Sequence, residues 1–280
     1  MNRSPKQFGW TGLVLAGLVS LWPAPGAGSE SFGVYEDWKS ARTIRSDRWI
    51  AREDGAPAQD VALGIDGHDL VMRQRRQGAV TSDTGITAAI QTLFARNPSA
   101  IDQMEVDVDV RRMEVSGCEA NPGQTSVRPA LLAFGAFNDG TPGGQTGDHY
   151  IQVQVNGPAD TIDRASLLDV QANVVRCSNA SCSVGDSPVY RLGIATIPVS
   201  TPFTLRAIWD RANHRFLVGV NGDPDVELLY DPALDTGNAR VPFASVRTAL
   251  LTANCTAGRT LADAEVAIGV VRTNVSAIIP

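Results

Sequence analysis

Apolar and polar residues alternate along many short segments of the chain, and a period of two predicts β-strands with one buried face. The clearest example is the segment 201–222. Two alternating runs flank a polar turn at 210–214, and Asn221-Gly222 supplies residues that tolerate positive φ. The segment therefore predicts a β-hairpin followed by a second tight turn. Its inward-facing residues are expected to be Phe203, Leu205, Ala207, Trp209, Phe216, Val218 and Val220.

Similar runs recur along the chain, separated by clusters of Gly, Pro, Asn and Asp. Asp66-Gly67 between two of them is a hairpin signal. The period of 86–94 is unclear, so this segment fits a strand or a short helix. About ten strands and no long amphipathic helix predict an all-β fold, either a β-sandwich or a β-barrel. The runs are 61–65, 70–75, 104–115, 130–137, 149–155, 166–176, 189–197, 226–230 and 266–271.

The N-terminus has the pattern of an export signal. Arg3 and Lys6 precede an apolar run at 12–22, and a stretch rich in small residues, Pro and Gly follows at 23–29. The apolar run is about half the ~20 residues that a membrane-spanning helix needs, which disfavours the alternative of a membrane anchor. We therefore expect residues 1–28 to be a signal peptide and 29–280 a single domain, secreted or periplasmic, with no membrane span after cleavage.

The charge of the chain argues against a nucleic-acid partner. The formal net charge is −6, and loss of Arg3 and Lys6 with the signal makes the mature charge about −8. Binding to nucleic acid requires a basic footprint, which this composition lacks.

The four cysteines predict two disulfides. An even number of cysteines in an exported protein is typical of disulfide bonding, and four cysteines allow three pairings. Cys177 and Cys182 enclose a loop short enough to close easily, which leaves Cys118 to pair with Cys255. A metal site is disfavoured because no histidine lies near them and no paired C-x-x-C spacing occurs.

Three segments resemble the concanavalin A-like lectin/glucanase superfamily. The start of the mature chain, 32–38 followed by 44–49, is similar to the aromatic-acidic opening of many exported members. The hairpin 204–221 is similar to the paired strands of laminin-G-like modules, and 264–271 resembles the closing strand beside the N-terminus. The resemblance implies a two-sheet antiparallel jelly-roll sandwich. Its motifs describe packing and turns, so they imply no reaction.

One acidic segment is a candidate catalytic strand. Glu105, Asp107 and Asp109 share one face, and the segment resembles the Glu-x-Asp-x-Glu strand of laminarinases and lichenases. The resemblance implies a nucleophile at Glu105, a helper at Asp107 and an acid/base at Asp109. However, a retaining pair needs carboxyl groups about 5–5.5 Å apart, whereas strand residues four positions apart are separated by roughly 13 Å. A solvated acidic face is the alternative.

Polar faces on several strands suggest a sugar-binding groove if they lie on the same side of a sheet. Amides, acids, a guanidinium and an aromatic ring suit the hydroxyl groups and C–H faces of sugars. The alternative is an ordinary solvated face of an antiparallel sheet. The candidate ligand-binding residues are Glu105, Asp107, Arg111, Tyr150, Gln152, Gln154, Asp169, Gln171, Asn173 and Arg206.

A flexible acidic loop at 138–148 is a weak candidate for a Ca²⁺-binding site, and the sequence suggests no other cofactor. Asp139 and Asp148 supply carboxylates, but the spacing is not that of a regular calcium loop, and a plain loop is the alternative. The leading hypothesis is an exported, lectin-like protein that binds a glycan or polysaccharide without catalysis. A β-glucan hydrolase using Glu105, Asp107 and Asp109 is the second hypothesis, and a structural or interaction module of the cell envelope is the third.

Overall fold

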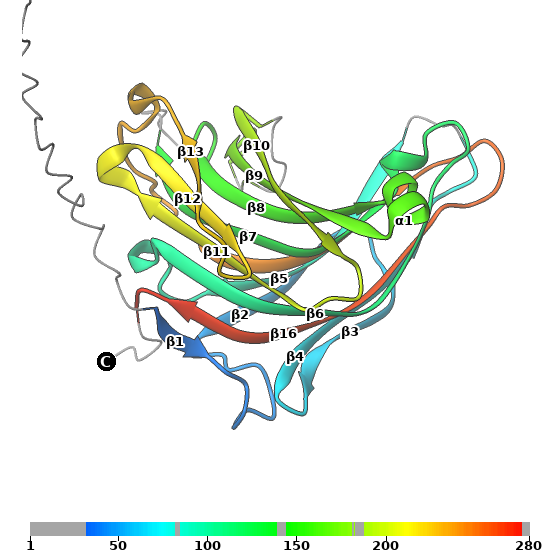
Figure 1. The fold of residues 1–280 in the computed structure, drawn as a ribbon, viewed down its shortest axis with the longest axis horizontal. Coiled ribbons are helices and arrows are strands. Elements are labelled where there is room, and N and C mark those ends of the chain that lie inside the picture. Colours follow the sequence, from blue (N-terminus) through cyan, green and yellow to red (C-terminus); the bar gives the residue numbers. More distant parts are fainter. Residues whose placement is uncertain (1–31, 82–84, 139–143, 181, 183–187, 276–280) are drawn as a thin grey trace, which may run out of the picture. The chain divides into compact units, whose positions relative to one another are not determined.

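The strands assemble into two antiparallel sheets that pack face to face, as the computed structural model shows (Figure 1). The structure describes residues 32–81, 85–138, 144–180, 182 and 188–275. All-β architecture with two antiparallel sheets is confirmed. The signal peptide expected at 1–28 and its boundary with the domain lie outside the described residues. Within the described ranges, no helix is long and apolar enough to cross a membrane.

The first sheet has the strand order β13-β12-β11-β6-β16-β4-β3, and β1 pairs with β16. Figure 1 shows β6 and β16 side by side in its middle, which is the longest pairing of the sheet. Its strands are β1 (Gly33–Glu36), β3 (Gln59–Asp66), β4 (Asp69–Gln77), β6 (Gln103–Ser116), β11 (Phe203–Asp210), β12 (Arg215–Val220), β13 (Val226–Leu229) and β16 (Leu261–Thr273).

The second sheet has the order β10-β9-β8-β7-β15-β5-β2, and β14 pairs with β7. The short helix α1 (Ala159–Ala165) follows β8 at one end of the sandwich (Figure 1). The strands are β2 (Trp49–Gly55), β5 (Ile86–Ala95), β7 (Ser126–Asn138), β8 (His149–Pro158), β9 (Leu167–Arg176), β10 (Tyr190–Pro198), β14 (Gly237–Asn238) and β15 (Ser245–Ala253).

Alternation along the strands decides which side chains form the core. Val106 and Val108 of β6 belong to the same buried cluster as Ile151 and Val153 of β8. Successive side chains of a strand point to opposite faces, so the polar residues between these valines and isoleucines lie on the outer faces of their sheets. Because β6 and β8 belong to different sheets, their polar faces lie on opposite sides of the sandwich.

The predicted hairpin forms as expected. β11 and β12 pair from Leu205↔Val220 to Asp210↔Arg215. Asn221 and Gly222 adopt φ of 54° and 77°, the left-handed region that their sequence favours. The ambiguous segment 86–94 is a strand, β5.

Both predicted disulfides are present. Cys118 and Cys255 are joined across a sequence separation of 137. Cys177 and Cys182 close a short loop with a separation of 5. No cysteine is free.

Candidate functional site

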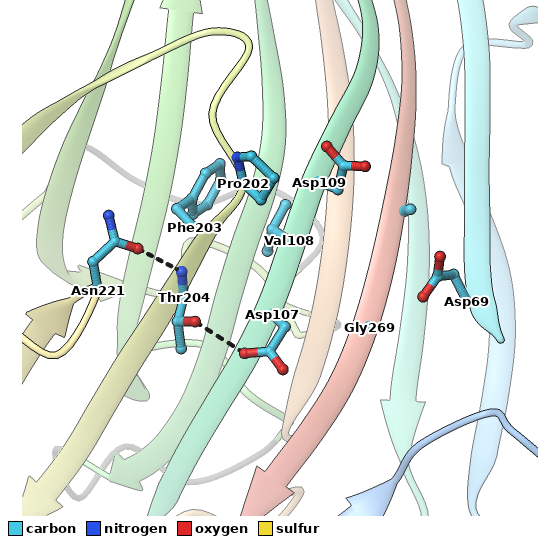
Figure 2. Close-up of a pocket in the computed structure, with 10 residues that line it drawn as sticks. Asp69, Asp107, Val108, Asp109, Pro202, Phe203, Thr204, Asn221 and Gly269 are labelled. Carbon is cyan, nitrogen blue, oxygen red and sulfur yellow. Dashed lines mark hydrogen bonds between the residues drawn. The ribbon is translucent and has the colours of Figure 1, made fainter.

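The outer face of the first sheet carries the acidic residues of β6, held by an arginine from the neighbouring strand. Arg272 on β16 binds the carboxylate of Glu105 at 2.9 Å and that of Asp107 at 3.1 Å. Thr204 Oγ1 also donates to Asp107 Oδ1 at 2.9 Å (Figure 2). These carboxylates are partly exposed, so each ion pair contributes about 1 kcal/mol or less to stability. One guanidinium therefore bridges two carboxylates of β6.

The other candidates of this sheet are also held in ion pairs or border a hollow. Arg206 binds Asp225 at 2.6 Å, and Arg111 binds Asp69 at 2.7 Å. Asp109 lies at the edge of a hollow of about 340 Å³ (Figure 2). The hollow is lined by Asp69, Asp107, Val108, Asp109, Pro202, Phe203, Thr204, Asn221, Ala267 and Gly269.

The second sheet has a larger depression on its outer face. Two cavities of about 240 and 420 Å³ share Ile90, Cys182 and Arg247 in their lining, and we call them together the second-sheet groove. Its smaller part is lined by the candidate residues Tyr150, Gln152, Gln154 and Asn173. The full lining of the groove is Ile50, Arg52, Asp54, Ala88, Ile90, Thr92, Phe94, Ala95, Arg96, Pro98, Arg128, Leu131, Gln145, Tyr150, Gln152, Gln154, Asn173, Val175, Cys182, Pro188, Arg191, Val241, Pro242, Phe243, Arg247, Ala249 and Leu251.

Strand register explains which side chains meet in the groove. Paired residues of adjacent strands share a face of the sheet, so one row across the sheet runs through Arg52, Thr92, Arg247, Leu131, Gln154 and Gln171. A second row runs through Ile50, Phe94, Ser245, Ala133, Gln152, Asn173 and Arg191. The side chains are small in the middle of the second row, at Ser245 and Ala133, and long on either side. Ser245 and Ala133 are fully buried beneath this face, and the longer side chains around them line the groove, apolar at Ile50 and Phe94 and polar at Gln152, Asn173 and Arg191.

An irregularity in β7 adds a cationic residue to this face. Arg128 pairs with Ala249 and Leu131 pairs with Arg247, so three steps on β7 correspond to two on β15. One extra residue in a strand is a β-bulge. Because of it, Arg128 and Leu131 lie on the same face of the sheet although they are three residues apart. Pro129 lies within the bulge and has no N–H to donate to the ladder. The bulge therefore brings Arg128 into the groove beside Leu131.

Polar contacts order the side chains at the small end of the groove. Gln154 Nε2 donates to Gln171 Oε1 at 3.3 Å, and Arg191 Nε donates to Asn173 Oδ1 at 3.1 Å. Burial raises the pKa of the Tyr150 hydroxyl, although the charges of Arg247 and Arg128 act in the opposite direction. The phenol therefore stays neutral at physiological pH and can donate a hydrogen bond.

Aromatic rings line the larger end of the groove. Phe243 lies edge-on to Tyr150, with ring centroids 4.9 Å apart. The guanidinium of Arg247 lies 5.4 Å from the ring centroid of Phe94 and 5.7 Å from that of Phe243. Apolar rings beside amides and guanidinium groups suit a ligand with both C–H faces and polar substituents.

The ten candidate ligand-binding residues thus fall into two groups on opposite sides of the sandwich. Tyr150, Gln152, Gln154 and Asn173 line the groove, with Gln171 bonded to Gln154. Asp169, on the same strand, pairs with Asn156 and is not part of the lining. A single groove containing all ten cannot form, because β6 and β11 belong to the first sheet. The members on the first sheet are Glu105, Asp107, Arg111 and Arg206.

Sequence reasoning missed the arginines of the groove. Arg247 lies on β15, a strand that the sequence analysis did not predict, and Arg128 reaches the groove through the bulge. Arg191 was within a predicted strand, but its place beside Asn173 depends on strand pairing. The one local signal was that Arg247 alternates with Val246 and Thr248, which are buried, so that Arg247 is expected on the outer face of a strand.

Calcium binding at the acidic loop stays a prediction. Asp139 lies outside the described residues. Asp148 is buried, its N–H donates to Gln145 O, and its carbonyl accepts from Cys177 N–H. Among the described residues, no three His, Cys, Asp or Glu side chains form a group suited to a metal ion.

Comparisons with known proteins give no family assignment, and the similar solved structures are distant. No family model and no curated protein matches the chain. Similar solved structures include the catalytic domain of a laminarinase from Thermotoga petrophila RKU-1, with 14% identity and a TM-score of 0.49 over 86% of this chain and 97% of that chain. SCLam, a non-specific endo-β-1,3(4)-glucanase from family GH16, has 12% identity and a TM-score of 0.43 over 85% and 90%.

A lectin is among the similar structures as well. Lectin UEA-II, complexed with galactose, has 10% identity and a TM-score of 0.36 over 86% of this chain and 98% of that chain. At these identities the likeness concerns the fold alone. The described strands themselves form two facing antiparallel sheets, the architecture that the sequence resemblance implies.

Proposed function

We propose that the protein is an exported carbohydrate-binding sandwich that holds a glycan in the second-sheet groove without catalysis. The observation that carries the proposal is the convergence of Tyr150, Gln152, Gln154 and Asn173 with the Phe243 ring in one groove. Neutral amides and a phenol bind sugar hydroxyls, and a ring packs against sugar C–H groups. Two disulfides favour an oxidising compartment, which supports export.

The alternative of hydrolysis by the β6 carboxylates has less support. Arg272 bridges Glu105 and Asp107, and Asp109 lies four residues from Glu105 on the same strand. Both Glu105 and Asp107 are thus engaged as ion-pair partners of one guanidinium, which disfavours their use as nucleophile and helper.

Affinity electrophoresis against a panel of neutral and acidic polysaccharides tests the proposal. We expect retardation of the wild-type protein by at least one polymer. Gln152→Ala and Asn173→Ala should each weaken that binding about 3- to 10-fold, since each removes polar contacts worth roughly 0.5–1.5 kcal/mol. Glu105→Gln, on the opposite face, is the matched control and should bind as the wild type does.

Two results would refute the proposal. One is the absence of retardation by every polymer in the panel, with and without calcium. The other is shortening of the bound polymer during incubation, which would show a catalytic protein. Shortening that disappears in Glu105→Gln would establish the β6 hydrolase instead.

A further inference from the structure

The second-sheet groove is cationic on a chain whose net charge is negative. Among the described residues that line it, Arg52, Arg96, Arg128, Arg191 and Arg247 stand against a single acid, Asp54. The whole chain carries a formal charge of −6. A groove of one sign raises the local concentration of ligands of the other sign. The charge of this face therefore favours anions.

Four of these arginines lack a carboxylate partner among the described residues. Arg52 is paired with Asp54 at 2.6 Å. Arg96, Arg128, Arg191 and Arg247 make no ion pair with any carboxylate in the part of the chain that the structure describes, although Arg96 Nε donates to Ser46 O at 3.0 Å. On the first sheet, by contrast, Arg111, Arg206 and Arg272 all have such partners, as shown above. Several guanidinium groups without a carboxylate partner among the described residues therefore gather in the groove.

The Arg247 guanidinium is fixed in position rather than free in solvent. It lies against Phe94 and Phe243, and its Nε donates to Ser245 Oγ at 2.9 Å. Burial lowers its pKa, because the groove solvates the cation poorly. An anion bound to this guanidinium would restore the lost solvation.

Arg128 is in a similar situation. Burial lowers its pKa, and the nearby charge of Arg191 lowers it further. Its Nε atom is buried and has no hydrogen-bond partner among the described residues. In the same part of the groove, Gln154 Oε1 and Asn173 Nδ2 are also buried without a described partner. A buried donor without a partner costs free energy, and a bound ligand would supply the missing partners.

We propose that the glycan held in the second-sheet groove is acidic and that its carboxylate or sulfate groups are bound by the guanidinium groups of Arg247 and Arg128. This inference rests on the proposed function and names the substrate class of the same site. Guanidinium groups bind carboxylates and sulfates alike through two parallel N–H···O bonds, so either group on the glycan would be recognised in the same way. A neutral glycan would leave these cations without neutralising partners.

Two pairs of polymers with matched backbones test the charge requirement. Polygalacturonate is compared with its carboxyl-reduced form, and dextran sulfate with dextran, by affinity electrophoresis and titration calorimetry at two salt concentrations. We expect at least one acidic polymer to bind more than 10-fold more tightly than its neutral counterpart, and its affinity to fall as salt rises. The pair that shows the difference identifies the anion as carboxylate or sulfate.

Charge-removing variants assign the effect to the groove. Arg247→Gln and Arg128→Gln should each weaken acidic-polymer binding about 10- to 100-fold, because hydrogen bonds to charged groups contribute strongly. Arg247→Lys keeps the charge without the planar donor pair and should lose less. Arg272→Gln, on the first sheet, is the control and should bind normally. Arg191→Gln, at an exposed edge-strand position, provides a further test should a buried substitution prevent folding.

The outcomes separate this inference from the proposed function. Equal affinity for the acidic and neutral polymers of each pair, unchanged in Arg247→Gln and Arg191→Gln, would overturn the inference. The groove would then be a site for neutral carbohydrate. Acidic binding abolished by Arg272→Gln but not by Arg247→Gln would also overturn it. No binding of any polymer here or in the wider panel would instead refute the proposed function.

Discussion

Replacing both Cys118 and Cys255 by alanine lowers the free energy of unfolding by about 4 kcal/mol and the melting temperature by about 10 °C. The cross-link joins residues separated by 137 positions. Loop-closure entropy for such a span corresponds to about 5 kcal/mol, and engineered or removed cross-links often give somewhat less. Urea unfolding followed by circular dichroism measures the change.

The second disulfide is the matched control for this result. Cys177 and Cys182 are separated by only 5 positions, for which the same entropy relation gives about 2 kcal/mol. The paired replacement Cys177→Ala and Cys182→Ala should therefore destabilise the protein about half as much. Equal losses from the two double variants would contradict the chain-entropy account of the long cross-link.

Truncation of Phe137 to alanine costs about 3–5 kcal/mol of stability. Phe137 belongs to β7 in the second sheet and is fully buried. Its ring centroid lies 4.8 Å from that of Tyr230, 5.7 Å from Trp209 and 6.5 Å from Phe216. Trp209 and Phe216 come from strands of the first sheet, so one ring connects the two layers. Its removal leaves a cavity between them.

Chemical denaturation followed by intrinsic tryptophan fluorescence measures this cost. Phe137→Leu keeps most of the volume and should lose less than Phe137→Ala. Leu229→Ala provides the surface control, because the Leu229 side chain is 60% exposed and its truncation should change stability by about 0.5 kcal/mol or less. A loss of unfolding free energy below about 1 kcal/mol in Phe137→Ala would show that the contacts of Phe137 with Trp209, Phe216 and Tyr230 do not hold the sheets together.

The sequence predicts most of the strands because their periodicity is local information. The hairpin of β11 and β12 is specified by alternating residues and by Asn221-Gly222 at its end. The short cross-link between Cys177 and Cys182 follows equally from local spacing. Such features depend on neighbours a few positions away, which the sequence shows directly.

β15 escapes prediction because its inward face is not uniformly apolar. Val246 and Leu250 point into the core, but Thr248 and Thr252 are buried with them. Thr248 Oγ1 accepts a hydrogen bond at 2.8 Å from Gln74 Nε2 on the facing sheet, which satisfies the buried hydroxyl. A strand whose buried face includes polar residues with distant partners shows weak alternation. Arg247 was missed together with this strand.

The candidate site is only half predictable for the same reason. Alternation correctly indicates that Glu105 and Gln152 lie on polar faces, but nothing local shows that β6 and β8 belong to different sheets. Strand pairing over long sequence separations decides that question. The position of Arg128 depends on a bulge at Pro129, since regular alternation would place Arg128 and Leu131 on opposite faces.

The most direct test of the groove follows the arginine side chains themselves. Nε–Hε resonances of the ¹⁵N-labelled protein, assigned by single Arg→Lys variants, are recorded while a galacturonate hexamer is added. We predict large shifts for Arg247, Arg128 and Arg191, with Arg206 and Arg272 on the first sheet unchanged. Shifts confined to Arg206 and Arg272, with the three groove arginines unaffected, would place the ligand on the opposite face and contradict this account.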